Sequence, residues 1–199
     1  MSQTLNLRQL KRSRLYSEQL GIRLCDRSEA ENFKWFLASI LFGTKISETI
    51  ATNTYAAFKR HRLLTPRKII NTGRDCLVHT IMHEGGYVRY DGRKSEQVLR
   101  NCTELLRHYK GRVGDVHTAS LDKHDLEQRL LAFYGIGPVT TNIFLRELRP
   151  YWCKADPEPL TVIFKTAERL GVDISGLRRN SVGFNRVEAG LIRARESAH

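Results

Sequence analysis

The chain has 199 residues, enough for one domain or two small lobes and too few for a large multidomain enzyme. Its 33 lysine and arginine residues outnumber 21 acidic residues, which gives a formal net charge of +12 and makes nucleic acid the usual partner to expect. The longest apolar run, residues 35–42, is far too short to span a membrane, and the basic N-terminus lacks the apolar stretch of a secretory signal. We therefore expect an intracellular protein of the cytoplasm or nucleoid.

Helix signals recur along the chain. Ser28 and Glu31 form a capping box before apolar residues at helical spacing, and Ser47 opens a second helix. Thr65-Pro66 is a cap followed by a proline that can occupy the first helical position. Further helices are predicted for residues 75–85, 95–109, 123–133, 139–148, 158–170 and 185–196.

No segment alternates apolar and polar residues as a half-buried strand does, so the predicted fold class is all-α. Asp91-Gly92, flanked by arginines, is interpreted as an exposed loop. We expect two helical lobes with a DNA-binding cleft: a central lobe of residues 29–149, and a second lobe built from 1–28 and 150–199.

The most informative stretch joins two predicted helices through Gly135-Ile136-Gly137. Glycines allow a tight turn and a close approach, and the helix after the turn presents free N–H groups and its positive dipole end to an anion such as a DNA phosphate. Ile136 would anchor this turn in the core. The alternative is a plain connection in which the glycines only end the first helix.

These residues resemble a known motif. Residues 133–141, within a helical pair at about 123–148, look like the helix-hairpin-helix of the endonuclease III-like DNA glycosylase superfamily. Residues 33–58 are similar to the paired helices of that family, including the loop at Gly43-Thr44-Lys45. The family carries its catalytic aspartate after the second helix of the hairpin, where Asp156 lies here.

Two departures from the family narrow the expectation. Members that also cleave the DNA strand carry a lysine where this chain has Val139, and a valine cannot form the Schiff base that cleavage needs. The iron–sulfur cysteines of the family are also absent, and cysteines 25, 76, 102 and 153 are predicted to be buried free thiols. Among members without the lysine, the local match is to the 3-methyladenine glycosylases.

Asp156 is the predicted catalytic residue. A fixed carboxylate stabilises the positive charge that develops on the sugar during base hydrolysis, and it can orient the attacking water. Asp156-Pro157 before a predicted helix also fits a simple N-cap, and both roles can coexist. Glu158 is the reserve carboxylate.

The resemblance implies that a base is flipped out of the duplex, and it assigns DNA contacts to two loops besides the hairpin. One loop contributes Thr44, where relatives carry a wedging glutamine, and Lys45. The other spans residues 86–93, with tyrosines that could fill the gap and arginines that could bind phosphates. A solvated basic loop with one buried tyrosine is the alternative. The predicted DNA contacts are Thr44, Lys45, Tyr87, Arg89, Tyr90, Arg93, Gly135, Ile136, Gly137, Val139 and Thr140.

A flipped base needs flat aromatic surfaces around it. Tyr134, at the mouth of the hairpin, is the first candidate for this pocket, and Trp35 and Trp152 are further ones, although Trp35 has the helical spacing of a core residue. Arginines 178, 179, 186, 193 and 195 are interpreted as a solvated face. We expect no metal and no cofactor, apart from a monovalent cation that the hairpin could bind.

The predicted function is a monomeric, monofunctional DNA glycosylase of base excision repair, without lyase activity. Its partner is double-stranded DNA with a damaged or mismatched base, and the resemblance favours an alkylated purine. The alternatives are a mismatch uracil or thymine glycosylase and a helix-hairpin-helix DNA-binding protein without catalysis.

Overall fold

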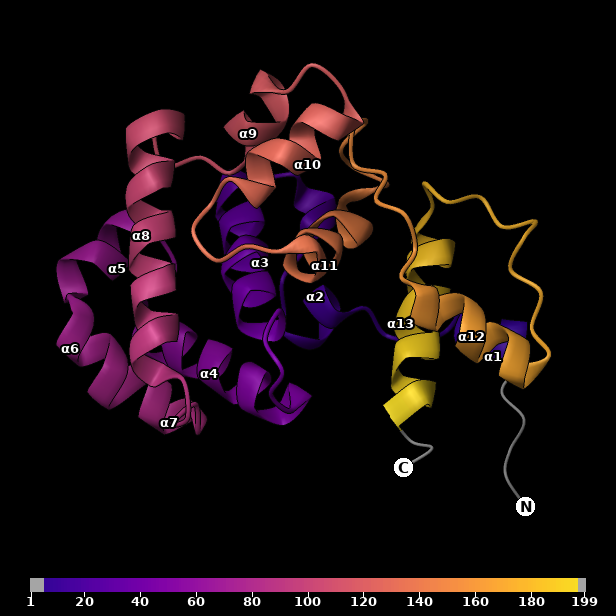
Figure 1. Ribbon diagram of the computed structural model, residues 1–199, viewed down its shortest axis with the longest axis horizontal. Helices are drawn as coiled ribbons and strands as arrows, with labels where there is room; N and C mark the ends of the chain where they lie inside the picture. Colours follow the sequence, from indigo (N-terminus) through magenta and orange to yellow (C-terminus); the bar gives the residue numbers. More distant parts are fainter. Residues whose placement is uncertain (1–5, 197–199) are drawn as a thin grey trace.

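A computed structural model describes residues 6–196, and within this range every regular element is helical, which confirms the all-α prediction (Figure 1). None of the helices in this range is both long and apolar enough to cross a membrane. The terminal residues 1–5 and 197–199 of the predicted second lobe lie outside the described part. The elements are α1 (Leu7–Leu10), α2 (Tyr16–Gln19), the short 3-10 helix η1 (Leu24–Asp26), α3 (Glu29–Phe42), α4 (Glu48–Arg60), α5 (Pro66–Thr72), α6 (Arg74–Cys76), the π-helical turn η2 (Leu77–Met82), α7 (His83–Gly85), α8 (Asp91–Tyr109), α9 (Gly114–Ala119), α10 (Lys123–Leu131), α11 (Pro138–Leu148), α12 (Thr161–Leu170) and α13 (Val182–Glu196).

The predicted caps start their helices. Ser28 accepts a hydrogen bond from the Glu31 amide, Ser47 caps α4 in the same way, and Thr65 caps α5 ahead of its first-turn proline. Only half of the expected capping box forms, because the Glu31 carboxylate accepts from the Arg23 amide at 2.8 Å instead of turning back to Ser28.

Several elements differ from the prediction. α8 starts at Asp91, not at Ser95, so the residues interpreted as an exposed loop form its first turn; the Asp91 carboxylate binds the Gly92 amide there and contacts His83 at 3.2 Å. α9 was not predicted. α12 starts at Thr161, because Pro157 and Pro159 both disfavour helical geometry in the residue before them.

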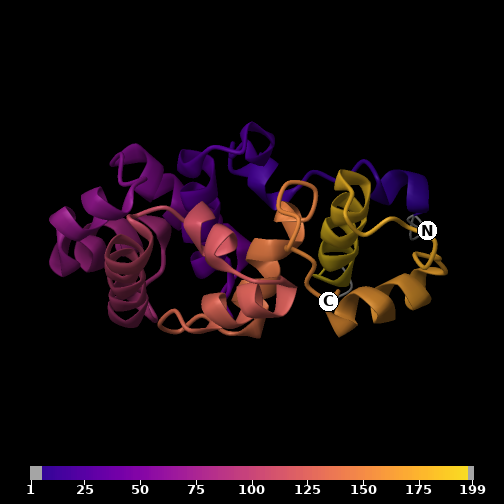
Figure 2. The same ribbon diagram turned by 90° about the horizontal axis from the view of Figure 1, so that it is seen from above.

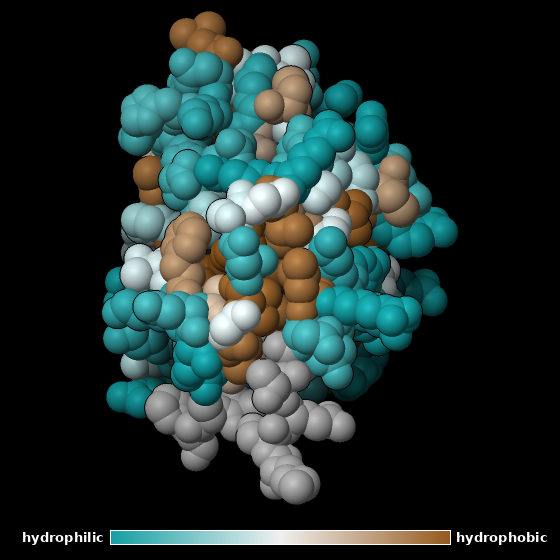
Figure 3. Space-filling view, turned by 90° about the vertical axis from the view of Figure 1, so that its right-hand side faces the viewer, coloured by the Kyte–Doolittle hydropathy of each residue, from teal (hydrophilic) through white to brown (hydrophobic). Residues whose placement is uncertain are grey.

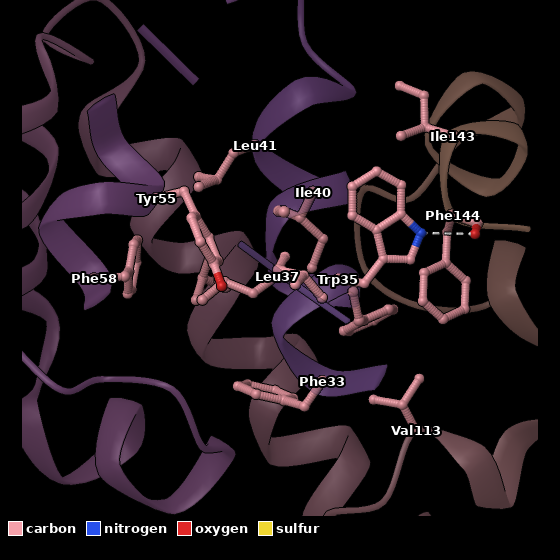
Figure 4. Packing of buried hydrophobic residues seen from close by; sticks show 14 of the residues in the cluster. Phe33, Trp35, Leu37, Ile40, Leu41, Tyr55, Phe58, Val113, Ile143 and Phe144 are labelled. Atoms are coloured by element: carbon pink, nitrogen blue, oxygen red, sulfur yellow. Dashed lines mark hydrogen bonds between the residues drawn. The ribbon is translucent and has the colours of Figure 1, made fainter. Parts of the chain in front are cut away.

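The main core forms around α3, which lies between the helices on both sides of it (Figures 1 and 2). Trp35 is fully buried and donates its indole N–H to the Phe144 carbonyl of α11 at 2.9 Å, and Leu37 and Ile40 pack beside it (Figure 4). The arrangement makes α3 and α11 the rigid centre that positions everything else.

A second, smaller apolar cluster lies at the end of the molecule that holds α1, α12 and α13 (Figure 1). Its buried members are Leu10, Ile163, Ala167, Val187 and Leu191. Tyr16, Leu20 and Leu24 of the N-terminal segment pack in the main core instead. The division into two lobes stays a prediction. Within it, the segment of residues 16–24 packs with the central lobe and not with the second lobe to which it was assigned.

Buried polar contacts tie α11 to the N-terminal segment, and a buried ion pair ties the residue after α11 to α13. Glu147 at the end of α11 accepts from the amides of Tyr16 and Ser17 at 2.9 and 3.0 Å, and complete burial raises the pKa of this carboxyl. Arg149 is fully buried and pairs with Glu188 of α13. The end of the molecule around α12 and α13 also carries partly covered apolar residues, which gather in the middle of its outer face (Figure 3).

Candidate nucleic-acid interface

The turn between α10 and α11 is built as a close connection. Gly135 has a φ of +68°, and a Cβ there would lie 2.9 Å from the Nε2 atom of Gln97 on α8. The backbone conformation therefore favours glycine at position 135, and a larger residue would also displace the Gln97 amide. Ile136 is buried, as expected, and Gly137 has an ordinary φ of −105° with no atom near the position of a Cβ.

The first turn of α11 leaves amide groups open. Thr141 is the first residue whose N–H binds back, to the Gly137 carbonyl at 3.0 Å, and nothing in residues 6–196 accepts from the amides of Val139 and Thr140. The Val139 side chain is 51% exposed. The Thr140 side chain is buried beside the Gly43 backbone, so the part of Thr140 that is open to an anion is its amide. This end of α11 has the donors and the dipole that favour an anion.

Three segments that are far apart in the sequence converge on one cavity beside this turn. They are the loop after α3, the start of α8 with the residue before it, and the hairpin turn. The cavity, called the basic cavity below, has a volume of about 400 Å³ and is lined by Gly43, Thr44, Lys45, Tyr90, Arg93, Lys94, Gln97, Tyr134 and Gly135. Six of these residues were predicted from sequence as DNA or base contacts, and no carboxylate is among the lining residues.

The buried side of the basic cavity is formed by two residues that the sequence did not single out. Lys94 is 5% exposed and donates through Nζ to the Ile40 carbonyl at 2.9 Å and to Gln97 Oε1 at 2.6 Å. Burial, with the nearby Arg93 charge, lowers the pKa of Lys94 to about 8. Its helical spacing with Gln97 and Asn101, which share the buried side of α8, was the available signal, but the predicted helix started one residue too late to include it.

Several predicted contacts lie elsewhere. Tyr87 is 1% exposed, and burial raises its pKa to about 12, so this side chain belongs to the core and cannot fill a gap in DNA in this conformation. Trp35 is a core residue as well. Trp152 is 6% exposed and stacks on His117 with 4.9 Å between ring centroids, so it forms no open pocket wall. Arg89 is outside the cavity lining and lies over the Tyr90 ring at 5.3 Å.

Asp156 is not a helix cap. It lies in an extended segment five residues before α12, whose N-cap is Leu160. Its Oδ1 atom is 3.0 Å from Arg179 Nη2 and 3.6 Å from Nε of the buried Arg149. The Asp156 side chain remains 37% exposed. The capping alternative is therefore wrong, and two arginines hold this carboxylate instead.

Arg179 also corrects the expectation of a solvated arginine face. It binds both carboxylate oxygens of Glu158 at 3.0 Å and donates to the Pro157 carbonyl at 3.0 Å. Asn142 of α11 donates to the Glu158 carbonyl at 2.7 Å. These bonds fix the Asp156 segment against the helix that follows the hairpin. The pairing could not be read from the sequence, since Arg179 lies 23 residues after Asp156.

A separate groove of about 160 Å³ lies beside Val139, between α11 and the α12–α13 end. Its walls are mainly apolar, with Phe42, Ile143 and Val162 among them, and no lysine is among its lining residues. An amine that could attack a sugar is therefore missing from the position where the resemblance would place it.

The cysteine prediction is only partly right. Cys102 is buried, which raises the pKa of its thiol, but Cys25, Cys76 and Cys153 are exposed, so the prediction of four buried thiols is wrong. No group of three or more metal-ligating side chains occurs among residues 6–196. Comparison with known proteins adds nothing to these observations: no protein-family profile, no curated protein and no solved structure matches the chain.

Proposed function

We propose that this protein is a DNA-binding enzyme that hydrolyses the N-glycosidic bond of a damaged or mismatched base. The observation that carries the proposal is the convergence of three segments on the basic cavity beside the open end of α11. Lys45, Arg93 and Lys94 give this region three positive charges without a lining carboxylate, which suits a polyanion. The α10–α11 pair would then act as a helix-hairpin-helix that binds a phosphate without reading sequence.

Asp156 supplies the chemistry in this proposal. A carboxylate next to the sugar stabilises the oxocarbenium-like transition state and can take the proton of the attacking water. The contacts with Arg179 and Arg149 fix its orientation, and the Asn142 bond to Glu158 ties its segment to α11. The required carboxylate is thus rigidly held and still partly open to solvent.

Val139 makes the proposed enzyme monofunctional. With no amine at this exposed position, water is the nucleophile, and the product is an intact strand with an abasic site. We expect strand breakage only after added alkali, and no protein–DNA adduct after treatment with borohydride.

The direct test is an excision assay with a panel of duplex oligonucleotides. The panel contains alkylated purines, uracil and thymine in mismatches, deaminated purines and undamaged controls. Release of one base class, with an alkali-labile strand as product, supports the proposal. Binding of every duplex without excision contradicts it, and a borohydride-trapped adduct contradicts the water mechanism.

A second candidate is a DNA-binding protein without catalysis. One observation favours it: the Asp156 carboxylate is already engaged by Arg179 and faces Arg149. In that case the two arginines and Asp156 only brace the segment before α12. The excision assay separates the two candidates, because both predict DNA binding and only the first predicts release of a base.

A further inference from the structure

The buried side of the basic cavity offers donors that make no hydrogen bond among the described residues 6–196. The Lys94 ammonium has three N–H bonds and binds two acceptors, the Ile40 carbonyl and Gln97 Oε1. Because Gln97 Oε1 accepts from Lys94, the amide orientation is fixed, and its NH₂ group makes no hydrogen bond within residues 6–196. Lys94 and Gln97 are both more than nine-tenths buried. The donors left over at the cavity are therefore available to acceptors of a ligand, which would replace water there.

The remaining lining defines the size and shape of that ligand. A volume of about 400 Å³ is in the range of small-molecule sites and can hold a nucleotide. Tyr90 and Tyr134, which are 36% and 42% exposed, provide aromatic surface at the cavity, and Arg100 lies over the Tyr134 ring at 4.3 Å. Lys45 and Arg93 are exposed cations that suit the phosphates on either side of a nucleotide.

We propose that the basic cavity binds one extruded nucleotide of a DNA strand, and that Lys94 and Gln97 select a neutral base whose edge carries acceptors. Uracil, thymine and guanine present carbonyl oxygens to these donors. Adenine has no carbonyl oxygen, and its amino group places another donor beside its ring-nitrogen acceptors. This inference rests on the proposed DNA binding and names the class of base for the site.

The charge of the cavity disfavours the class of base that the family resemblance implied. Alkylation at N3 or N7 gives a purine a positive charge, and this cavity already holds Lys45, Arg93 and Lys94 with no carboxylate among its lining residues. Like charges placed together in a partly buried site cost binding energy. Cationic alkylated purines are therefore disfavoured here.

The test measures the affinity for duplexes that carry a single unpaired nucleotide: uracil, thymine, guanine, adenine or 7-methylguanine. Fluorescence anisotropy at one fixed salt concentration should show uracil, thymine and guanine bound about 5-fold or more tightly than adenine and 7-methylguanine. Equal affinity for all five, or the tightest binding to 7-methylguanine, overturns the inference.

Variants then locate the preference. Gln97→Glu keeps the acceptor for Lys94 and replaces the free NH₂ with an acceptor, so we expect the preference to disappear. Lys94→Met keeps the aliphatic chain and removes the donors, with the same expected result. Gln128→Glu, at an exposed position of α10, is the matched control for the added negative charge and should keep the preference. Circular dichroism reports folding, and Gln97→Glu alone decides the matter if Lys94→Met does not fold.

The outcomes separate this inference from the proposed function. A preference that depends on Lys94 and Gln97, without excision of any base, supports the cavity and contradicts the enzyme. Excision without any effect of these variants contradicts the cavity alone. No binding to any duplex contradicts both.

Discussion

The basic cavity includes the turn before α11, and the Asp156 segment follows α11 along the chain. The two regions differ in whether their charged groups are already paired within the protein. The cavity gathers three cations with no lining carboxylate and keeps donors unused. In the Asp156 segment, both carboxylates are bound by Arg179, and Arg149 stands behind Asp156. The cavity is prepared for a ligand that brings acceptors, whereas the Asp156 segment already has its partners. If Asp156 is catalytic, its carboxylate has to act on the bound sugar while it remains in contact with Arg179 and Arg149.

The largest effect is expected from Asp156→Asn, which removes the charge and keeps the size. We expect base excision to fall by about 10²-fold or more, the scale of one important electrostatic group, while DNA affinity changes little. Single-turnover excision and anisotropy measure the two quantities. Asp173→Asn, an exposed aspartate after α12, is the matched control and should keep full activity. Full activity of Asp156→Asn would show that Asp156 has only a structural role in this segment.

Gly137→Val tests the hairpin turn beside the basic cavity. A Cβ at Gly137 meets no atom within 4 Å and the φ is ordinary, so the variant should fold, but its side chain would stand between the open amides and a phosphate. We expect DNA affinity to fall about 10-fold, whatever the base, as expected for a lost charge-assisted phosphate contact. Gly176→Val, equally unhindered and outside the interface, is the control, and equal affinity of the two variants would make the turn a simple connector.

Lys94 should give stability and binding opposite dependences on pH. Its folded pKa of about 8 lies below the ordinary value of 10.5, so the unfolded chain binds more protons between these values and the free energy of unfolding should rise there. We expect a gain of about 1 kcal/mol from pH 7 to pH 9 that Lys94→Met lacks, measured by urea unfolding.

Over the same range, the cavity loses one cation, so the preference for acceptor-bearing bases should weaken. The other titratable groups at the cavity are Lys45, Arg93, Tyr90 and Tyr134, with Tyr87 on the buried side of Lys94. A preference that stays constant from pH 7 to pH 9 would separate Lys94 from recognition.

The smallest effect is expected from Glu158→Gln. The Glu158 side chain is 75% exposed, and its pair with Arg179 is solvent-screened, so its loss should change excision less than about 2-fold. The rate of single-turnover excision, measured for this variant and for Asp156→Asn under the same conditions, tests the prediction. A large loss would move the catalytic role to Glu158.

The sequence predicted those features that depend on neighbouring residues. Ser28, Ser47 and Thr65 start their helices because a side-chain oxygen can satisfy an amide three residues later, and that requirement is local. The turn at Gly135 was predictable for the same reason, since only a few residue types accept its conformation.

Features that depend on distant partners were missed. The exposed character assumed for Arg179 was wrong because Asp156 and Glu158 reach it only in the folded chain. Lys94 was overlooked because a buried lysine is rare, and its acceptor on Ile40 lies 54 residues earlier. Tyr87 was named as a possible DNA contact because it lies in a basic loop. The sequence alone does not distinguish an exposed tyrosine in such a loop from one that packs in the core.

The Glu147 contact limits when the N-terminal segment can complete its native hydrogen bonds during synthesis. The amides of Tyr16 and Ser17 find their carboxylate only after about 130 further residues have left the ribosome. At ordinary rates of elongation, this delay is on the order of 10 s. Until then the amides of Tyr16 and Ser17 have no Glu147 carboxylate to bind, so this segment gains these native hydrogen bonds only late in synthesis.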